Sequence, residues 1–374
     1  MDIKIITCHD VYNYGASLQA YALSHYIQSE GHEVKIIDYL PDYKPNMYDL
    51  TRLTEQGIFG GIAKRVPFLK SLCGLCRNRH LIKFLGRRDS FDAFKNKFLN
   101  LTVPTATSCE MLEEQKMQAD LFIAGSDQIW NPNYGNGWDK SYYCGFVVGK
   151  SRCISYAASF GVSKIEDDFR LFLAQQLKNF ESISVREASG VKLLQELGVT
   201  SANVLDPVFL LSKDKWKCLV REKFSFKYLL VYDFHNDNPK LKRLAQRIAK
   251  KQGLKIVAIN EEITIPYADK NVNDAGPIEF LSLIYGAEVV IASSFHAAAF
   301  SIIFNKDFYV FPLLGHHNSS RITDLLQMLK LEDRFDPDDI TALHVNYDIP
   351  NERLSEKIKF SKNWLTNNLV DNKS

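Results

Sequence analysis

The stretch from Pro277 to Pro312, PIEFLSLIYGAEVVIASSFHAAAFSIIFNKDFYVFP, constrains the fold more than any other part of the chain. A proline in a first helical turn and short β-branched runs between apolar helical patterns predict four elements in order. They are a helix from Pro277 to Ala287, a strand from Glu288 to Ser293, a helix from about His296 to Phe304, and a strand from Asp307 to Phe311. This order is typical of a parallel sheet covered by helices, so it predicts an α/β fold.

His296 lies in the turn between the first of these strands and the second helix. Open α/β sheets bind ligands at the carboxyl ends of their strands, and a helix N-terminus presents free N–H groups to an anion. Ser293 and Ser294 can cap the helix, and Ser294 is also a candidate for binding the substrate. An imidazole there can donate a proton or bind a negative group. The alternative is that His296 only caps the helix or is a satisfied core histidine.

Composition limits the kind of protein. The chain has 374 residues, enough for two domains, with 46 % hydrophobic and 24 % charged residues and a net charge of +2. This charge does not favour nucleic acid as a partner. No apolar run is long enough to span a membrane, and the charged start MDIKIITCHD is typical of a first strand rather than a signal peptide.

The cysteines do not indicate a metal centre. The chain has seven, and Cys73 and Cys76 form one CxxC motif without a second pair or a nearby pair of histidines. A structural zinc site needs about four ligands, so we expect no metal. Scattered, odd-numbered thiols favour a reduced, cytoplasmic protein.

The first βαβ unit has a tight loop at the predicted sheet edge. Ile3–Cys8 is predicted as a strand, a helix begins at Ser17, and Val34–Asp38 is the next strand. The unit lacks the GxGxxG pattern, so it does not indicate a dinucleotide. Asn13 and Gly15 lie in the loop, which either lines a binding pocket or is a simple turn.

A basic segment interrupts the alternation of strands and helices between residues 42 and 100. From Gly57 to Arg88 it contains no acidic residue, and its cations include Lys64, Arg65, Arg77, Arg79, Arg87 and Arg88. Such a stretch can lie at an anionic membrane surface, which would place the protein peripherally at the inner face of the membrane. The alternative is a solvated helical insertion packed on the domain.

Further polar residues follow predicted strands. Asp127 and Gln128 come after the strand Leu121–Ala124 and either bind hydroxyl groups or stabilise a turn. Arg186 follows the strand Ser182–Val185, and Arg321 begins a helix in a second βα series. We therefore predict two Rossmann-like domains with parallel sheets, facing each other across a cleft. Their expected limits are 1–210, 211–350 and a C-terminal helix within 351–374.

Several sequence blocks occur together and in a fixed order. They are NYGASLQAYAL from Asn13, AGSDQIWNP from Ala124, SYAASFG from Ser155, SVRE from Ser184, VLDPVFLL from Val204 and SSFHAAAFSIIFNKDF from Ser293. The set resembles the polysaccharide pyruvyl transferase family over residues 3 to about 335. The resemblance implies a fold like that of two-domain nucleotide-sugar glycosyltransferases (GT-B-like), with the site between the two halves.

The resemblance also implies a reaction. Pyruvate would pass from phosphoenolpyruvate to a glycan as a cyclic ketal, and the acceptor in such pathways is often lipid-linked. His296 and Arg186 match active-site residues of the family, and no cofactor or metal is required. Many members carry an arginine shortly before the histidine, whereas Ser294 and Phe295 stand there in this chain.

The residues fit this chemistry. Arginine binds phosphate and carboxylate through paired hydrogen bonds, so Arg186 and Arg321 are candidates for the donor. The alternative is that Arg186 pairs with a carboxylate such as Glu187 or Asp206, and that Arg321 only caps its helix. His296 is the candidate acid, Asp127 positions or deprotonates the acceptor, and the general base stays unassigned. Two alternatives remain: a glycosyltransferase that uses a nucleotide-sugar, and a non-catalytic glycan-binding protein.

Overall fold

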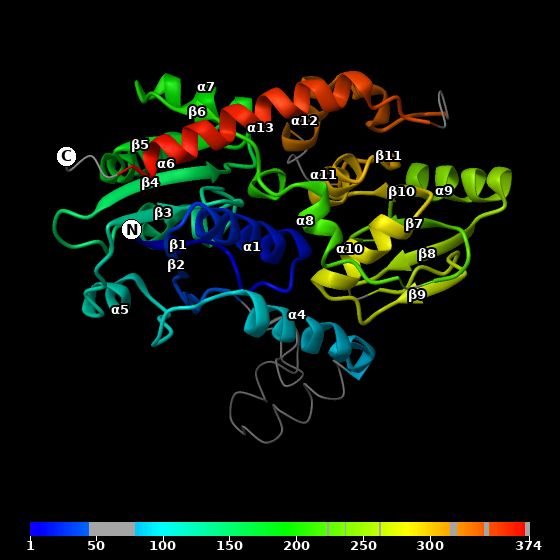
Figure 1. The fold of residues 1–374 in the computed structure, drawn as a ribbon, viewed down its shortest axis with the longest axis horizontal. Helices are drawn as coiled ribbons and strands as arrows, with labels where there is room; N and C mark the ends of the chain where they lie inside the picture. The colour runs from blue at the N-terminus through cyan, green and yellow to red at the C-terminus, as the bar shows by residue number, and fades with distance from the viewer. Residues whose placement is uncertain are drawn as a thin grey trace.

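The computed structural model describes residues 1–44, 79–222, 224–235, 237–261, 263–314, 320–339 and 344–370. These residues form two parallel β-sheets, each flanked by helices (Figure 1). The first sheet has the order β2-β1-β3-β4-β5-β6, and its strands are β1 (Asp2–Ile6), β2 (Glu33–Ile36), β3 (Leu121–Ala124), β4 (Arg152–Ala158), β5 (Ser182–Val185) and β6 (Ala202–Asn203).

The second sheet has the order β11-β10-β7-β8-β9. Its strands are β7 (Tyr228–Tyr232), β8 (Lys255–Ile259), β9 (Lys270–Val272), β10 (Val289–Ala292) and β11 (Asp307–Val310). The described strands of both sheets pair in parallel, with registers such as Ile3↔Leu121 and Val289↔Leu229. The prediction of two parallel α/β units is therefore confirmed.

The helices lie between the strands in the chain. They are α1 (Tyr14–Ser29), α4 (Leu85–Phe98), α5 (Cys109–Glu114), α6 (Asp167–Gln176), α7 (Ala188–Glu196), α8 (Lys213–Lys217), α9 (Pro239–Gln252), α10 (Pro277–Gly286), α11 (Phe295–Ile303), α12 (Ser320–Leu329) and α13 (Asp348–Asn368). Short 3₁₀ turns are at 79–84, 135–138, 140–143, 177–179, 207–209 and 332–334. None of the described helices is long and apolar enough to cross a membrane.

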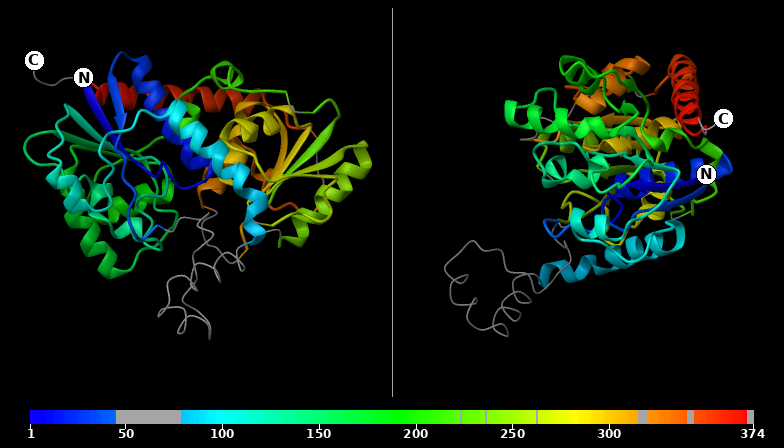
Figure 2. Two further views of the ribbon diagram at one scale, coloured as in Figure 1. Left: turned by 90° about the horizontal axis from the view of Figure 1, so that it is seen from below. Right: turned by 90° about the vertical axis from the view of Figure 1, so that its left-hand side faces the viewer.

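The long helix α13 connects the two halves of the molecule. It begins beside the second sheet and runs back along the first, so both chain ends lie on the same side (Figures 1 and 2). Ser361 on α13 donates its hydroxyl to Lys357 O and accepts a hydrogen bond of 3.0 Å from Leu205 N. The Trp364 ring packs 6.1 Å from the Tyr156 ring of β4. The C-terminal helix thus stabilises the relative position of the sheets.

The first helix begins earlier than predicted. Its start is Tyr14 rather than Ser17, because the Asn13 side chain accepts a hydrogen bond from Ala16 N and caps the helix. Tyr14 is buried and stacks on Phe280 of α10, with ring centroids 4.6 Å apart. The Asn13 cap and the packing of Tyr14 on the second domain together account for the earlier helix start. Gly15 therefore lies in the first turn of the helix and not in a loop.

The predicted membrane contact has to be corrected at Arg87. Lys64, Arg65 and Arg77 lie outside the described residues, and the side chain of Arg79 is not described. Arg87 is fully buried: it lies over the Tyr14 and Phe91 rings and forms an ion pair of 3.2 Å with Glu261 of the second domain. A residue in this position joins domains and cannot reach a membrane surface.

Arg87 and its neighbour Arg88 offer a matched test of this interdomain contact. Arg87→Ala should lower the free energy of unfolding by about 3–5 kcal/mol, because it leaves the Glu261 carboxylate without its buried partner. Arg88 is partly exposed and pairs with Asp89, so Arg88→Ala should change it by no more than about 0.5 kcal/mol. Chemical unfolding of both variants measures the difference, and indistinguishable curves would contradict the buried bridge.

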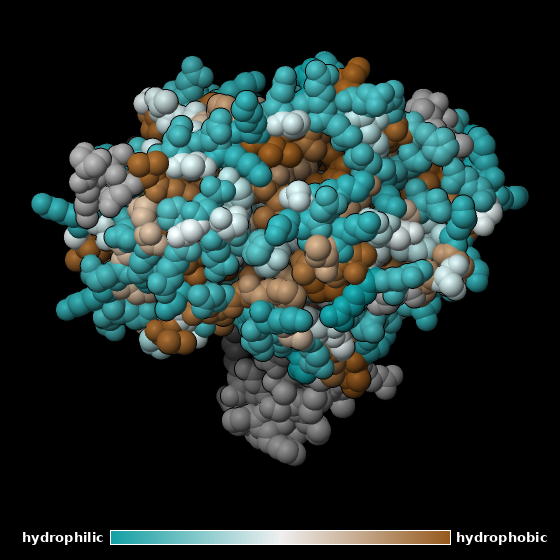
Figure 3. All heavy atoms as spheres, viewed as in Figure 1, coloured by the Kyte–Doolittle hydropathy of each residue, from teal (hydrophilic) through white to brown (hydrophobic). Residues whose placement is uncertain are grey.

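The surface gives no sign of a broad apolar interface on the side seen in Figure 3. The described residues there are mostly hydrophilic, and hydrophobic ones show in separate patches. Scattered apolar residues of this kind are normal for a protein surface. In open α/β sheets, ligands bind at the carboxyl ends of the strands, next to the point where successive connections run to opposite sides. The functional groups of this protein are expected there.

Candidate active site

His296 lies at a switch point of the second sheet. Strand β10 is flanked by β11 and β7, and the chain leaves its carboxyl end into α11. Ser294 caps this helix, its hydroxyl accepting from Ala297 N at 3.4 Å, which confirms the predicted cap. His296 follows in the first turn and is only 6 % exposed, so it is more buried than a pocket-edge residue. The local pattern of strand, serine cap and apolar helix is sufficient to place it there.

The first turn of α1 closes on the His296 ring from the other domain. A Cβ atom at Gly15 would lie 1.9 Å from His296 Nδ1 and 2.3 Å from Cε1. No side chain can occupy that space while the ring stays where it is. Gly15 is therefore required for close approach of a helix start to the imidazole, and the N-termini of α1 and α11 both face this point.

Asp206 links the histidine to Arg186. One of its oxygens, Oδ2, lies 2.5 Å from Arg186 Nη1 and 3.5 Å from His296 Nε2, and its side chain is fully buried. Burial by itself would raise the pKa of Asp206, but His296 and Arg186 hold that pKa well below its ordinary value. Asp206 is thus ionised at neutral pH and supplies a fixed negative charge between two basic side chains.

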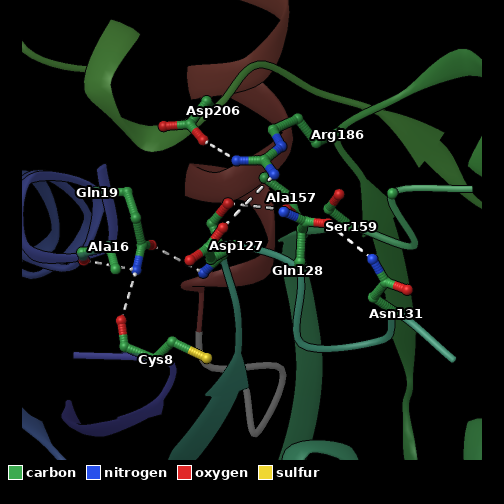
Figure 4. A network of polar contacts seen from close by, with 12 residues as sticks. Cys8, Ala16, Gln19, Asp127, Gln128, Asn131, Ala157, Ser159, Arg186 and Asp206 are labelled. Carbon is green, nitrogen blue, oxygen red and sulfur yellow. Dashed lines mark hydrogen bonds and ion pairs between the residues drawn. The ribbon is translucent and has the colours of Figure 1, made fainter. Parts of the chain in front are cut away.

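Asp127 approaches the same arginine from β3. Its Oδ1 atom is 3.7 Å from Arg186 Nη2, and its side chain is 17 % exposed (Figure 4). Burial would lower the pKa of Arg186, but Asp206, Asp127 and then Glu187 raise it. Although Arg186 is surrounded by carboxylates, its Nε and Nη2 atoms are buried and make no hydrogen bond with the described residues.

Arg321 joins the group from α12. Its guanidinium carbon lies 5.8 Å from the centre of the Phe295 ring, and that of Arg186 lies 4.9 Å from the same centre. Burial, followed by the repulsion from Arg186, lowers the pKa of Arg321 to about 10. It stays charged at neutral pH, and its Nε atom is buried without a hydrogen bond to the described residues. Two cations near one aromatic ring that repel each other favour a bound anion.

A cavity of about 400 Å³ opens beside these arginines. It is bounded by the loop after β5, by β6 and the following turn, by the start of α11, and by α12 and α13. Arg186, Asp206, Phe295 and Arg321 form its more buried end. This volume is in the range of small-molecule sites in proteins.

Gln128 is held in place by a loop of the first domain. Asn131 Nδ2 donates to Gln128 Oε1 at 2.7 Å, and a Cβ at Gly161 would lie 2.3 Å from that oxygen. The Glu187 carboxylate in turn accepts from Phe160 N at 2.7 Å and Gly161 N at 3.0 Å. The SVRE block therefore provides one residue at the cavity and one that shapes the loop beneath Gln128.

The structure brings together some of the predicted residues and separates others by task. His296 and Arg186 both contact Asp206, and Asp127 and Arg321 lie near Arg186. The Asn13 and Ser294 side chains instead cap helices. Asp206 and Phe295 were not among the predicted site residues. Two sequence signals point to Asp206: it stands before a proline after the last strand of the first sheet, and it lies within the block VLDPVFLL. No group of three or more His, Cys, Asp or Glu among the described residues is arranged to hold a metal ion.

The architecture and this cluster define a two-domain α/β protein of the GT-B type. A protein from Listeria monocytogenes described as a UDP-N-acetylglucosamine 2-epimerase superposes with a TM-score of 0.51 at 7 % identity, covering 97 % of this chain and 89 % of its own. The S. aureus MnaA–UDP structure gives 0.49 at 10 % identity, covering 96 % and 87 %. At such identities the likeness concerns the fold alone.

The family assignment comes from the sequence. Residues 13–313 match the family described as polysaccharide pyruvyl transferase, and the chain belongs to this family. The match spans the caps of α1 and α11, Asp127, Arg186 and His296. Among curated proteins no match is found. The predicted family and the predicted GT-B-like fold are thus confirmed, and the roles of the individual residues stay predictions.

Proposed function

We propose that the protein transfers pyruvate from phosphoenolpyruvate to two hydroxyl groups of a glycan, forming a cyclic ketal. The observation that carries the proposal is the pair of arginines at the Phe295 ring beside His296. Phosphoenolpyruvate has a phosphate and a carboxylate on one small carbon skeleton. Arg186 and Arg321 offer buried N–H groups without a hydrogen-bond partner among the described residues, and an anion bound by both relieves their mutual repulsion.

His296 is the proposed general acid. It gives a proton to the methylene carbon of the donor, which leaves an oxocarbenium-like centre on the neighbouring carbon. The ionised Asp206 carboxylate, 3.5 Å from Nε2, compensates the charge of a protonated ring before this step. The cost of holding an imidazolium at a buried place is therefore met by a group already present.

The acceptor completes the reaction. One sugar hydroxyl attacks the electrophilic carbon and loses its proton, and the bond from this carbon to the phosphate oxygen breaks. A second hydroxyl then attacks the same carbon and loses its proton as the ring closes. One of the two protons restores the histidine, and the other leaves on the phosphate. The products are the ketal, now with a methyl group, and inorganic phosphate. Asp127 is partly exposed at the carboxyl end of β3, where it can position an acceptor hydroxyl or take up its proton.

The decisive experiment follows phosphate release and product mass. The protein is incubated with phosphoenolpyruvate and a panel of free and lipid-linked glycans. We expect phosphate only when a suitable glycan is present, together with a glycan that carries one added pyruvyl group. Thermal unfolding with each donor adds a direct comparison, since a ligand that binds the folded state raises its stability. The proposal would be refuted in favour of a glycosyltransferase if a nucleotide-sugar stabilised the protein and was consumed while no acceptor gave a ketal. Stabilisation of the protein by glycan alone would favour a binding protein.

Conservative replacement of the arginines tests the donor site. Arg186→Lys and Arg321→Lys keep the charge but lose the planar pair of donors. Charge-assisted hydrogen bonds contribute about 1.5–3 kcal/mol each, so kcat/KM for phosphoenolpyruvate should fall by about one to two orders of magnitude in either variant. Steady-state kinetics at varied donor concentration measures this.

Arg170 provides the control for these variants. It is a partly exposed residue of α6 that pairs with Glu196 and does not line the cavity, so Arg170→Lys should keep the kinetic constants of the parent. If Arg186→Lys or Arg321→Lys behaves like Arg170→Lys, the arginine in question does not bind the donor. The alternative for Arg186 is a purely structural pair with Asp206, which lysine could retain.

A further inference from the structure

The exposed end of the cavity carries cations for which the proposed donor has no use. Lys330 at the end of α12 and Arg353 and Lys357 on α13 line it, together with Gln327 and Met328. We refer to Lys330, Arg353 and Lys357 as the outer wall. Phosphoenolpyruvate is much smaller than the ligands that pockets of about 300–1,000 Å³ enclose, so the outer wall stays uncovered when the donor lies at Arg186 and Arg321.

The described residues do not neutralise the positive charges of the outer wall. Lys357 Nζ donates to Asn203 O at 2.7 Å, and Arg353 Nε donates to Met328 O at 2.5 Å. Both acceptors are main-chain carbonyls without net charge. No ion pair joins a described carboxylate to any of the three residues. Burial lowers the pKa of Lys357, which indicates that its ammonium gives up hydration without gaining an acidic partner.

The two carboxylates in the cavity, those of Asp206 and Asp324, bind partners other than the outer wall. Asp206 lies between Arg186 and His296, and Asp324 Oδ2 accepts a hydrogen bond of 3.0 Å from Ala188 N. Five basic residues thus line a cavity that contains two acidic ones. An excess of this kind in a partly enclosed space attracts a ligand with more than one negative charge.

The spacing of the outer wall favours two adjacent phosphates. Arg353 and Lys357 are four residues apart on α13, so their side chains project from the same face of the helix. The guanidinium group can bind one phosphate through paired hydrogen bonds, while the ammonium group acts as a point charge for the next. Lys330 faces the cavity from α12 and adds a third donor.

We propose that the outer wall binds a diphosphate group, the group that joins an acceptor glycan to its lipid or nucleotide carrier. Naming the acceptor rests on the proposed function, but the diphosphate site itself does not. The carrier diphosphate would then lie at the exposed end of the cavity, with the donor at its buried end.

Calorimetric titration of the full-length protein with inorganic pyrophosphate tests the site. The parent protein should bind pyrophosphate, and Arg353→Gln/Lys357→Gln should bind it at least about tenfold more weakly, since two charge-assisted contacts are lost. Lys359→Gln is the matched control, because Lys359 is exposed on the same helix and does not line the cavity. Affinity for phosphoenolpyruvate should stay within about twofold in both variants.

Uridine diphosphate and a short-chain prenyl diphosphate, titrated in the same way, distinguish a nucleotide carrier from a lipid carrier. Equal pyrophosphate affinity in the double variant and the control would overturn the proposal. So would equal affinity of the parent for single phosphate and pyrophosphate, or a parallel loss of phosphoenolpyruvate binding, which would mean one site for the donor alone. The titration needs no turnover, so it tests the diphosphate site separately from the reaction. If the protein forms no ketal but binds pyrophosphate through the outer wall, only the proposed function is refuted.

Discussion

Replacing His296 by alanine should lower the rate of ketal formation by about 100-fold or more, the usual scale for a lost general acid. The loss should lie in kcat, because Arg186 and Arg321 still bind the donor. His296 is buried, so alanine leaves a cavity and removes one partner of Asp206. His296→Gln keeps most of the volume and serves as the second variant, whose stability should be closer to that of the parent.

Single-turnover kinetics with saturating phosphoenolpyruvate measures the effect on chemistry. His25→Ala on α1 is the control, because its ring stacks on Tyr21 at a partly exposed place away from the cluster, and the change should leave kcat unaltered. Full activity of His296→Gln would assign His296 a packing role under the start of α1. A folded His296→Gln with a kcat as low as that of His296→Ala supports proton transfer.

Local patterns in the sequence predict the elements around the site well. The helix from Pro277, the strand that precedes the serines and the helix capped by Ser294 all agree with the structure to within one or two residues. These features depend on caps, β-branched runs and apolar spacing, which neighbouring residues determine. The position of His296 at a strand end could therefore be predicted without knowledge of the other domain.

Contacts between distant segments could not be predicted in the same way. The sequence placed Arg87 in a basic run and indicated a solvated or membrane-bound surface, whereas Tyr14, Phe91 and Glu261 bury it between domains. Phe91 lies one turn further along α4, but nothing local to Arg87 indicates the Tyr14 ring of α1 or the Glu261 carboxylate of the second domain. A run of basic residues suggests an exposed surface when the carboxylate that pairs with one of them, here Glu261, is distant in the sequence.

Asp206 shows the same limit within the site. Its neighbours in the sequence indicate the end of a strand and a turn at Pro207. One carboxylate oxygen, Oδ1, accepts a hydrogen bond of 3.1 Å from Val208 N in that turn. The second oxygen contacts Arg186 and His296, which the fold brings from β5 and α11. A pair between Asp206 and Arg186 could be named from the sequence as an alternative, but the contact with His296 depends on how the two domains meet.

A substitution at Gly15 gives the most stringent test of the contact between the two domains at His296. Within α1, alanine is more favourable than glycine by about 0.8–1 kcal/mol, so Gly15→Ala should not harm the helix itself. The new methyl group would lie 1.9 Å from His296 Nδ1, so either the ring or the helix start has to move. We expect activity to fall about as far as in His296→Ala and the midpoint of thermal unfolding to decrease. Gly86→Ala, near the start of α4 with a Cβ 3.1 Å from Asp274 Cβ, is the matched control and should stay active.

The double variant Gly15→Ala/His296→Ala separates displacement of the ring from general damage. Without the imidazole the methyl group has room, so the double variant should unfold at a higher temperature than Gly15→Ala and be no less active than His296→Ala. The two changes would then be non-additive, as expected for residues in direct contact. Additive losses, or a Gly15→Ala protein with the activity of the parent, would show that the helix start and the imidazole do not form the contact on which the proposed acid depends.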